Sequence, residues 1–289
     1  MQINKHVSSR AVALETTLLV HGVPHSAAAG LAQELGRVVE AEGSTPALIG
    51  VLDGVPTVGM GMEQLQAMLD AESVPKANTA NLGIYIAQGS HAATTVSTTM
   101  EIAAFAGLRV FATGGLGGVH HGYGTQLDIS ADLMAFTRFP IAVVTSGVKS
   151  ILDVVSTREA LESLGVTVVG YQTDSFPAFY LRESDASVDV RFDDADELAE
   201  FVRVELARSG RGIVIANPIP GEHELDPGQW CKWLKRARKL AEGDGVSGRD
   251  VTPAILGHLH EVSEGKTLAA NLELVKSNAR VAAMVESRL

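Results

Sequence analysis

The sequence predicts a layered α/β fold, in which short strands alternate along the chain with amphipathic helices. Three observations support this prediction: brief apolar runs rich in β-branched residues, helical spacing of apolar residues between those runs, and a C-terminal region with helical spacing throughout. The chain has 289 residues, of which 46% are hydrophobic and 20% charged. A chain of this length and composition can bury a large core.

The expected elements follow one another in order. The helix at 193–209 is supported by acidic residues in its first turn, which complement the helix dipole. The other helices rest on apolar spacing, and the strands on β-branched apolar runs bounded by turn residues. We expect strands at 11–14, 46–52, 57–59, 108–112, 141–145, 166–171 and 212–216, and helices at 26–42, 62–71, 100–107, 150–164 and 193–209.

The character of the chain changes after the Pro218-Ile-Pro220 segment. From residue 226 the apolar spacing is helical, in segments 229–241, 252–263 and 268–289 that surround a glycine-rich turn at 242–248. We interpret 226–289 as a helical layer that closes over an α/β core ending at about residue 220. The whole chain, 1–289, is therefore expected to form one domain.

Charge and cysteine content exclude several classes of protein. The formal net charge of -11 argues against nucleic-acid binding, which needs basic patches, and we identify no basic run. The single cysteine, Cys231, excludes an internal disulfide, and we expect it to pack between Trp230 and Trp233. Residues 1–10 lack the apolar core of a signal peptide and no apolar run is long enough to span a membrane, so we expect a cytoplasmic location.

Lys149 is the strongest candidate for a catalytic residue. It ends the strand-like run 140–149 and is expected to open the helix at 150–164. An amine that loses solvent on one side is less stable in its charged form, and its lone pair can then attack a carbonyl carbon. The alternative is a lysine at a strand end whose head lies in water.

Two loop-like segments could hold an anion. The glycine-rich stretch 111–122 follows the expected strand 108–112, and its glycines could let main-chain N–H groups converge on an anion or a close-packed ligand. A tight structural turn explains this stretch equally well. The hydroxyl-rich run 90–99 precedes a helix, where it could bind a phosphate or simply cap the helix.

Three carboxylates could contribute chemistry. Asp128 and Asp132 are expected near the start of one helix, where they could cap it or bind a hard cation such as Mg²⁺ or Mn²⁺; a solvated helix face is the alternative for Asp132. Glu15 ends the first strand among apolar residues, which could raise its pKa and make it a general acid. The alternative for Glu15 is an edge-strand side chain that faces water. The histidines form no zinc motif, and His258 and His260 are expected on a surface helix.

Several ordered blocks along the chain match one enzyme family. They are 13–17 with His21 and Gly22, 46–54, 93–100, 110–120, 128–132, 147–153, 170–180, 216–220 and 270–279. Together these blocks resemble the pseudouridine-5'-phosphate glycosidase family from Val12 to about Ala283. The resemblance implies a homotrimeric α/β/α sandwich that uses Mn²⁺ and reversibly cleaves the C–C bond between uracil and ribose 5-phosphate.

The resemblance also implies roles for individual residues. The lysine that matches Lys149 forms an imine with the ring-opened ribose, the glutamate that matches Glu15 transfers protons, and the aspartate that matches Asp128 holds the metal. Substrate contacts are implied for Lys76, Val96, Ser130, Ala131, Asp132 and a C-terminal asparagine, which Asn271 matches better than Asn278.

One segment departs from the family pattern. Family members carry Arg-Arg-Asp shortly after the lysine that matches Lys76, whereas this chain has Ala77-Asn-Thr-Ala-Asn81. The phosphate or sugar pocket is therefore expected to be less basic. Two other functions stay open: a sugar-phosphate Schiff-base aldolase or lyase, which needs a similar lysine and acid, and a non-catalytic sugar-phosphate sensor.

Overall fold

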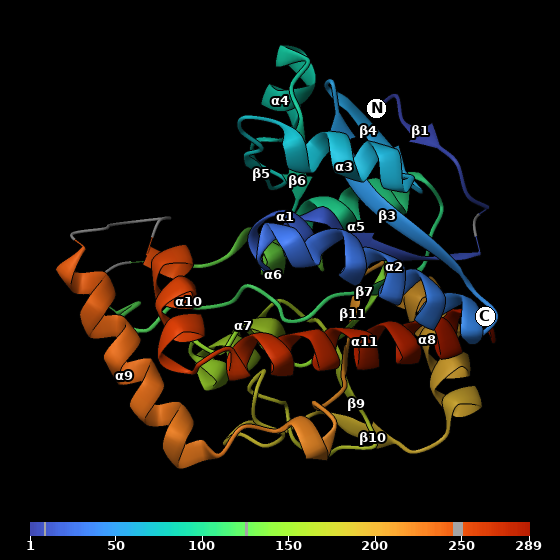
Figure 1. The fold of residues 1–289 in the computed structure, drawn as a ribbon. Coiled ribbons are helices and arrows are strands. Elements are labelled where there is room, and N and C mark those ends of the chain that lie inside the picture. Colours follow the sequence, from blue (N-terminus) through green and yellow to red (C-terminus); the bar gives the residue numbers. More distant parts are fainter. Residues whose placement is uncertain (9, 125–126, 245–250) are drawn as a thin grey trace.

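The computed structural model describes residues 1–8, 10–124, 127–244 and 251–289, and it confirms the predicted α/β class. A twisted sheet runs through the centre of the molecule with helices on both faces (Figure 1). In the described chain the strands are β1 (Asn4–Lys5), β2 (Ala11–Glu15), β3 (Thr45–Leu52), β4 (Val55–Val58), β5 (Lys76–Ala77), β6 (Ala92–Thr94), β7 (Val110–Ala112), β8 (Ala142–Thr145), β9 (Val168–Tyr171), β10 (Val190–Phe192) and β11 (Ile213–Ala216).

The order of the strands is β1-β4-β3-β2-β7-β8-β11-β9-β10, with β6 paired to β3 and β5 paired to β6. The pairs within β2-β7-β8-β11-β9-β10 are parallel, and β3 pairs antiparallel with β4 and β6. The side chains of β2, β7, β8 and β11 are buried, as expected for strands covered on both faces. Parallel strands place their carboxyl ends at one edge, and loops there can form a site.

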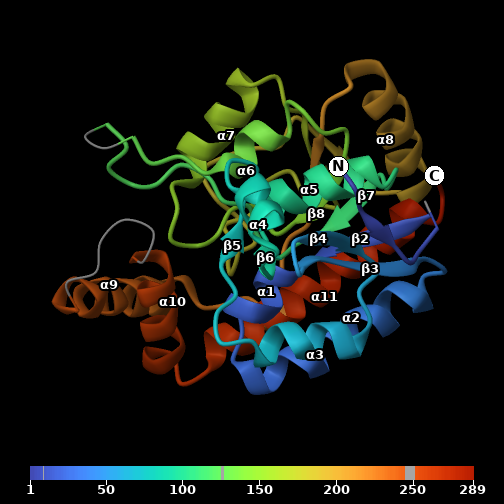
Figure 2. The ribbon, with the colours of Figure 1, turned by 90° about the horizontal axis from the view of Figure 1, so that it is seen from above.

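The helices form a layer on each side of this sheet. They are α1 (Thr16–His21), α2 (His25–Ala41), α3 (Met62–Asp70), α4 (Leu82–Gln88), α5 (Val96–Phe105), α6 (Ala131–Ala135), α7 (Val154–Ser163), α8 (Ala195–Ser209), α9 (Pro227–Gly243), α10 (Val251–Val262) and α11 (Lys266–Glu286), with a short 3-10 helix at Gly221–His223. Figure 2 shows α2 and α11 on one side of the sheet and α5 and α7 on the other.

The expected C-terminal helical layer is present, and its longest helix packs directly on the sheet. Helix α11 contacts β2, β7, β8 and the neighbouring α2, and buries Leu274, Val275 and Ala279 among other side chains. Helices α9 and α10 pack against each other beside the sheet and form what we call the helical arm (Figure 1). Among the described residues, no helix combines the length and the apolarity that crossing a bilayer requires.

Two expectations for α9 are wrong. Cys231 is exposed and does not pack between the tryptophans, because the buried face of α9 is formed by Trp230, Ala237 and Ala241. The helix also carries a basic stripe, although we identified no basic run in the sequence. The exposed residues of this stripe recur at helical spacing and are Lys232, Lys235, Arg236 and Lys239.

Two helices begin at other residues than expected. Helix α7 begins at Val154 rather than Ser150, because the Asp153 carboxylate accepts a hydrogen bond from the Ser156 N–H and caps the helix there. Residues 149–153 therefore form a loop. Helix α5 begins at Val96, before the expected 100–107, so that Ser97 to Thr99 lie in its first turns and are buried.

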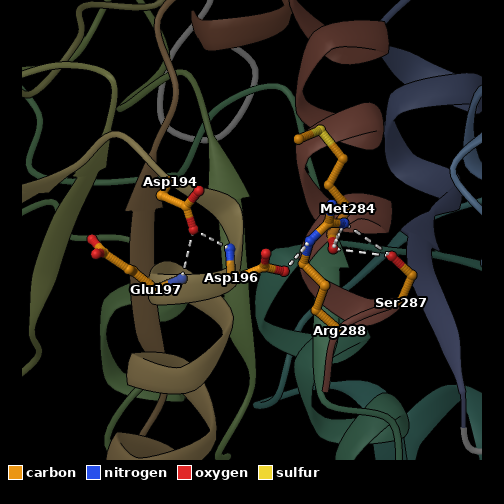
Figure 3. Close-up of polar contacts among 6 residues, drawn as sticks. All are labelled: Asp194, Asp196, Glu197, Met284, Ser287 and Arg288. Atoms are coloured by element: carbon orange, nitrogen blue, oxygen red, sulfur yellow. Dashed lines mark hydrogen bonds and ion pairs between the residues drawn. The ribbon is translucent and has the colours of Figure 1, made fainter.

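The start of α8 is joined to the end of α11. The Asp194 side chain accepts hydrogen bonds from the N–H groups of Asp196 and Glu197, which caps α8 (Figure 3). The carboxylate of Asp196 in turn accepts a hydrogen bond of 2.7 Å from Arg288 Nε, just beyond α11. This contact is exposed, so it contributes orientation more than stability.

A buried acid lies close to this contact, in the last turn of α11. Glu286 is 1% exposed, and its nearest cation is Arg109, whose Nη2 lies 3.5 Å from Oε1. Burial raises the pKa of Glu286 to about 7, and the attraction of Arg109 offsets only part of that effect. A carboxyl with a raised folded-state pKa contributes stability while it is protonated and loses it as it ionises.

We predict that stability falls as pH rises from about 4.5 to about 7, because the unfolded chain ionises Glu286 first. A Glu286→Gln variant should lose this dependence and be more stable than the parent chain at pH 7.5 by about 1–3 kcal/mol, but not at pH 4.5. Urea unfolding at the two pH values measures the difference. The exposed Glu183→Gln variant is the matched control. An equal effect of Glu286→Gln at both pH values would contradict the assignment.

Candidate active site

A cavity of about 110 Å³ lies at the carboxyl ends of β2, β7 and β8. Parallel strands end there together, so the residues that follow them meet although they are far apart in the sequence. The cavity brings together four of the predicted site residues: Glu15, Lys76, Lys149 and Asn271. It is also lined by His21, Thr113, Gly115, Phe179, Tyr180 and His260.

A larger cavity of about 300 Å³ also borders Glu15 but has different chemistry. Its walls come mainly from apolar side chains of α1, α2 and β3, such as Leu19, Leu35 and Leu48. No lysine lines it, and the ionisable groups besides Glu15 are Arg37 and Glu40. The smaller cavity is therefore the better candidate for nucleophilic chemistry, since it joins two amines to a carboxyl group.

Glu15 is the last residue of β2 and is buried, so the edge-strand alternative is wrong. Thr113 Oγ1 donates a hydrogen bond of 2.5 Å to Glu15 Oε1. Burial raises the pKa of Glu15, and nearby Asp132 adds to this effect, while Lys149, the Thr113 hydroxyl and Lys76 oppose it. A carboxyl group with a raised pKa and one oxygen already engaged is suited to transfer a proton from the other oxygen.

Lys149 is half-buried and follows β8 in a loop, rather than opening a helix. Its N–H donates to Leu116 O at 3.0 Å, and its carbonyl accepts from Leu152 N at 3.0 Å, so its backbone is fixed on both sides. The turn before it depends on Gly147, whose φ is +79° and where an added Cβ would overlap the Pro177 carbonyl. The side chain therefore reaches the cavity from a fixed segment that pairs with the turn after β7.

The glycines after β7 allow close packing of the neighbouring segments. A Cβ added to Gly115 would lie 2.6 Å from the Phe179 ring and 3.2 Å from Lys149 N. At Gly117 it would lie 2.2 Å from Ser130 Oγ. Gly117 N–H donates to Asp132 at 2.9 Å rather than to a free anion site. The tight-turn interpretation is thus correct for most of this stretch.

Asp132 is a buried residue that holds neighbouring segments of the site together. It is 4% exposed, which excludes the solvated-face alternative, and its two oxygens accept hydrogen bonds of 2.9 Å from Ser97 N and Gly117 N. Ser130 caps α6 by accepting from Asp132 N at 3.2 Å, so α6 begins at Ala131. Val96, at the start of α5, is fully buried. These residues join α5, α6 and the glycine turn, and the predicted contact residues Val96, Ser130, Ala131 and Asp132 do not line the cavity.

The two C-terminal asparagines have different positions. Asn278 is fully buried, donates to Thr113 O at 2.8 Å and accepts from Asn217 Nδ2 at 2.9 Å, which joins α11 to the ends of β7 and β11. Asn271 instead lines the cavity, and its buried Oδ1 has no hydrogen-bond partner within the described chain. Asn271 is therefore the asparagine that is available to a ligand.

Lys76 belongs to β5 and reaches the same cavity. The departing segment after it folds into an asparagine-capped turn: Asn78 Oδ1 accepts from Ala80 N at 2.8 Å, and Asn81 Oδ1 accepts from Asn78 N at 2.7 Å. Asn81 Nδ2 also donates to Lys76 O at 3.3 Å. The turn thus positions Lys76 without adding another cation.

Asp128 precedes α6 instead of lying within a helix, and it does not line the cavity. Its carboxylate is half exposed, and Oδ2 lies 3.8 Å from His120 Nδ1. In the described part of the chain, no group of three or more His, Cys, Asp or Glu side chains is arranged to hold a metal ion. The oxygen of Asp128 and the nitrogen of His120 would fit a cation that keeps several water ligands.

Several cavity residues were not predicted as site residues. His21 ends α1, and burial, followed by the charge of Lys76, lowers its pKa. His260 was expected on a surface helix but lines the cavity from α10. Phe179 has a left-handed backbone, φ +64°, and its ring meets Tyr180 at 4.7 Å. His21 lies in a matched block, whereas no local pattern distinguishes His260 from His258.

Known proteins share this architecture over nearly the whole chain. Residues 3–288 match the family described as Indigoidine synthase A like protein. Pseudouridine-5'-phosphate glycosidase of Dinoroseobacter shibae is 44% identical over 273 residues, covering 94% of this chain and 90% of that protein. The enzyme of the same name from Caldanaerobacter subterraneus subsp. tengcongensis is 43% identical, covering 96% and 91%.

Two solved structures are also similar. An indigoidine synthase A-like protein of Thermotoga maritima has a TM-score of 0.90 and 34% identity, covering 99% of this chain and 96% of that one. The prealnumycin C-glycosynthase AlnA, solved in complex with ribulose 5-phosphate, has a TM-score of 0.90 and 33% identity, covering 99% and 97%. The similarity includes the segments that form the cavity.

We predict that Gly115→Ala destabilises the protein by about 1–3 kcal/mol, because the added methyl group must displace Phe179 or the Lys149 main chain. Gly30→Ala is the matched control: it lies in α2 with no atom within 4 Å of the added carbon, and should be neutral or slightly stabilising. Denaturant midpoints measure both effects. Unchanged stability of Gly115→Ala would show that the turn is looser than described.

Proposed function

Because this chain belongs to the pseudouridine-5'-phosphate glycosidase family, we propose that it reversibly cleaves pseudouridine 5'-phosphate to uracil and ribose 5-phosphate. The observation that carries the proposal is the shared cavity of Lys149 and Glu15, an amine beside a buried carboxyl group. The C-glycosynthase AlnA, whose structure contains a sugar phosphate, adds support.

The bond to be broken explains why an amine is needed. A C–C glycosidic bond has no leaving heteroatom to protonate, so the usual chemistry of two carboxyl groups does not apply. In the proposed reaction, Lys149 Nζ bonds to C1 of the sugar while the bond from C1 to the ring oxygen breaks, and that oxygen takes a proton to become a hydroxyl group. A second proton goes to the uracil carbon that is bonded to C1. The C–C bond then breaks, its electron pair stays with the uracil ring, and the nitrogen lone pair forms the imine with C1. Water then releases ribose 5-phosphate and restores the amine.

Glu15 is the proposed proton carrier for this step. Its burial favours the protonated form, and Thr113 engages Oε1, which leaves Oε2 to face the reacting atoms. The charges of Lys149 and Lys76 lower the pKa of Glu15. An anionic substrate that binds these amines would weaken this effect and raise the pKa of the carboxyl group. The same group can return the proton in the synthetic direction.

The remaining residues are proposed to bind the substrate. Lys76 offers a cation for the phosphate from a turn that its asparagines hold in place. Asn271 offers an unpaired carbonyl oxygen inside the cavity. Main-chain and side-chain groups of Val96, Ser130, Ala131 and Asp132 would contribute from the segments joined to the glycine turn. The Asp132 carboxylate already accepts hydrogen bonds from two N–H groups.

We further propose Mn²⁺ as the cofactor, with Asp128 as its protein ligand and His120 as a neighbouring donor. A divalent cation there would supply positive field to the anionic substrate and keep waters among its ligands. A homotrimeric assembly, which the family resemblance implies, and a cytoplasmic location, as expected from the sequence, complete the proposal.

We predict that Lys149→Ala lowers turnover of pseudouridine 5'-phosphate by about 10³-fold or more, because it removes the amine proposed to form the imine, while Lys76 is proposed to bind the phosphate. Ribose 5-phosphate with borohydride should label the parent protein on the peptide that contains Lys149, and mass spectrometry after digestion detects the adduct. Retained turnover or an unlabelled Lys149 peptide would overturn the nucleophile assignment. Labelling without uracil release would favour a sugar-phosphate aldolase, and ligand-induced thermal stabilisation without any product would favour a sensor.

We also predict that chelation abolishes most activity and that added Mn²⁺ restores it. Asp128→Asn should require about tenfold more Mn²⁺ for half-maximal activity, because the amide oxygen carries no charge. Asp185→Asn, an exposed carboxylate far along the chain, controls for the loss of one negative charge. Full activity of the chelated protein would refute the metal requirement.

A further inference from the structure

The helical arm contributes two side chains to the cavity. Leu256 and His260 lie one turn apart on α10, and both line the cavity that contains Lys149. The other walls come from loops at the sheet edge and from α1 and α11. His260 is thus a polar side chain that the arm presents to the site, and the steps proposed above leave it without a role.

His260 is oriented by a buried hydrogen-bond chain at the start of α11. Its Nδ1 lies 2.9 Å from Thr267 Oγ1, and Thr267 Oγ1 lies 2.9 Å from Ser263 Oγ. Both hydroxyl residues are buried, so the ring is held in one orientation. Since Nδ1 is engaged, Nε2 is the ring nitrogen left for a ligand. Ser263 Oγ also lies 3.3 Å from the His260 carbonyl oxygen, so its one proton has two acceptors. The tautomer with the ring proton on Nε2 is the one in which Ser263 donates to Thr267 and Thr267 donates to Nδ1.

The surroundings of His260 favour an uncharged imidazole ring. Burial alone lowers the pKa of His260, whereas the charge of Lys76 also lowers the pKa of His21. The lowered pKa favours the neutral imidazole at pH 7, and a neutral ring suits an uncharged group better than a phosphate. An uncharged ring with carbonyl groups is a better match for a neutral imidazole.

Asn271 gives an independent indication of a ligand near His260. It lies one helical turn after Thr267 on α11, on the face that meets His260. Its Oδ1 is buried and has no partner within the described chain, and the residue is 6% exposed. An unpaired buried carbonyl is costly, so this position is suited to a ligand with an N–H group.

We propose that His260 determines base specificity, by donating a hydrogen bond from Nε2 to a carbonyl group of the leaving base. The inference rests on the proposed function, because it takes uracil as the base. Uracil carries an N–H flanked by two carbonyl groups, which matches one acceptor from Asn271 and one donor from His260. Leu256 adds an apolar contact for the flat ring.

The test compares three variants in the synthetic direction, with ribose 5-phosphate and uracil. His260→Leu should raise the KM for uracil about 10- to 100-fold, because one hydrogen bond to a buried carbonyl is lost. His260→Gln, whose amide nitrogen can take the place of Nε2, should stay within about fivefold of the parent protein. His258→Leu is the matched control, since His258 lies on the same helix and pairs with Asp244 and Glu261.

Borohydride trapping of ribose 5-phosphate on Lys149 separates this role from a structural one, because trapping needs no base. All three variants should trap the sugar within about twofold of the parent protein. An unchanged KM for uracil in His260→Leu would overturn the proposal, and so would an equal loss of uracil binding and trapping. A parent protein that traps the sugar but does not use uracil would refute the proposed function itself.

Discussion

The site depends on a steric constraint in the turn after β7, where only glycine allows the surrounding segments to approach. Phe179 packs against Gly115, and Ser130 and Asp132 pack against Gly117. The same turn pairs through Leu116 with the segment that carries Lys149. Because protein interiors are close-packed, a methyl group here moves several elements together. The position of the Lys149 amine thus depends on the lack of side chains at Gly115 and Gly117.

Burial then sets the electrostatics of the cavity. Glu15 is removed from water at the end of β2, so its carboxyl group favours the protonated form although two lysines lie nearby. The two amines come from β5 and from the loop after β8, and both line the cavity together with Glu15. A protonated carboxyl group and amines can therefore share one cavity without forming an exposed ion pair.

Sequence reasoning predicted the fold class and the residues that end strands. Apolar runs are reliable where both faces of a strand are buried, as in β2 and β8, and Glu15 and Lys149 lie just at or after those ends. The first residues of the helices were harder to predict, because several nearby polar residues could cap a helix and the sequence does not show that Asp153 is the one that does. Asp132 could not be assigned from spacing, since its partners, Ser97 and Gly117, are distant in sequence.

The arm residues show a second reason why prediction is incomplete. His258 and His260 lie two positions apart on an amphipathic helix, and only the packing of α10 beside α11 decides which of them faces the cavity. Cys231 was misplaced in the same way, because the buried face of α9 depends on its contact with α10. The periodicity of apolar residues predicts which face of a helix is buried, but it does not predict which neighbouring element covers that face.

The helical arm also separates the residues proposed to recognise the base from the residues that react, which many enzymes place on the same loops. The reacting groups come from the edge of the sheet, while Leu256 and His260 come from a helix outside it. Divergence within α10 could therefore exchange one leaving group for another while the covalent chemistry is inherited unchanged. A lineage of carbon–carbon bond-forming and bond-breaking catalysts could diversify by altering this one helix.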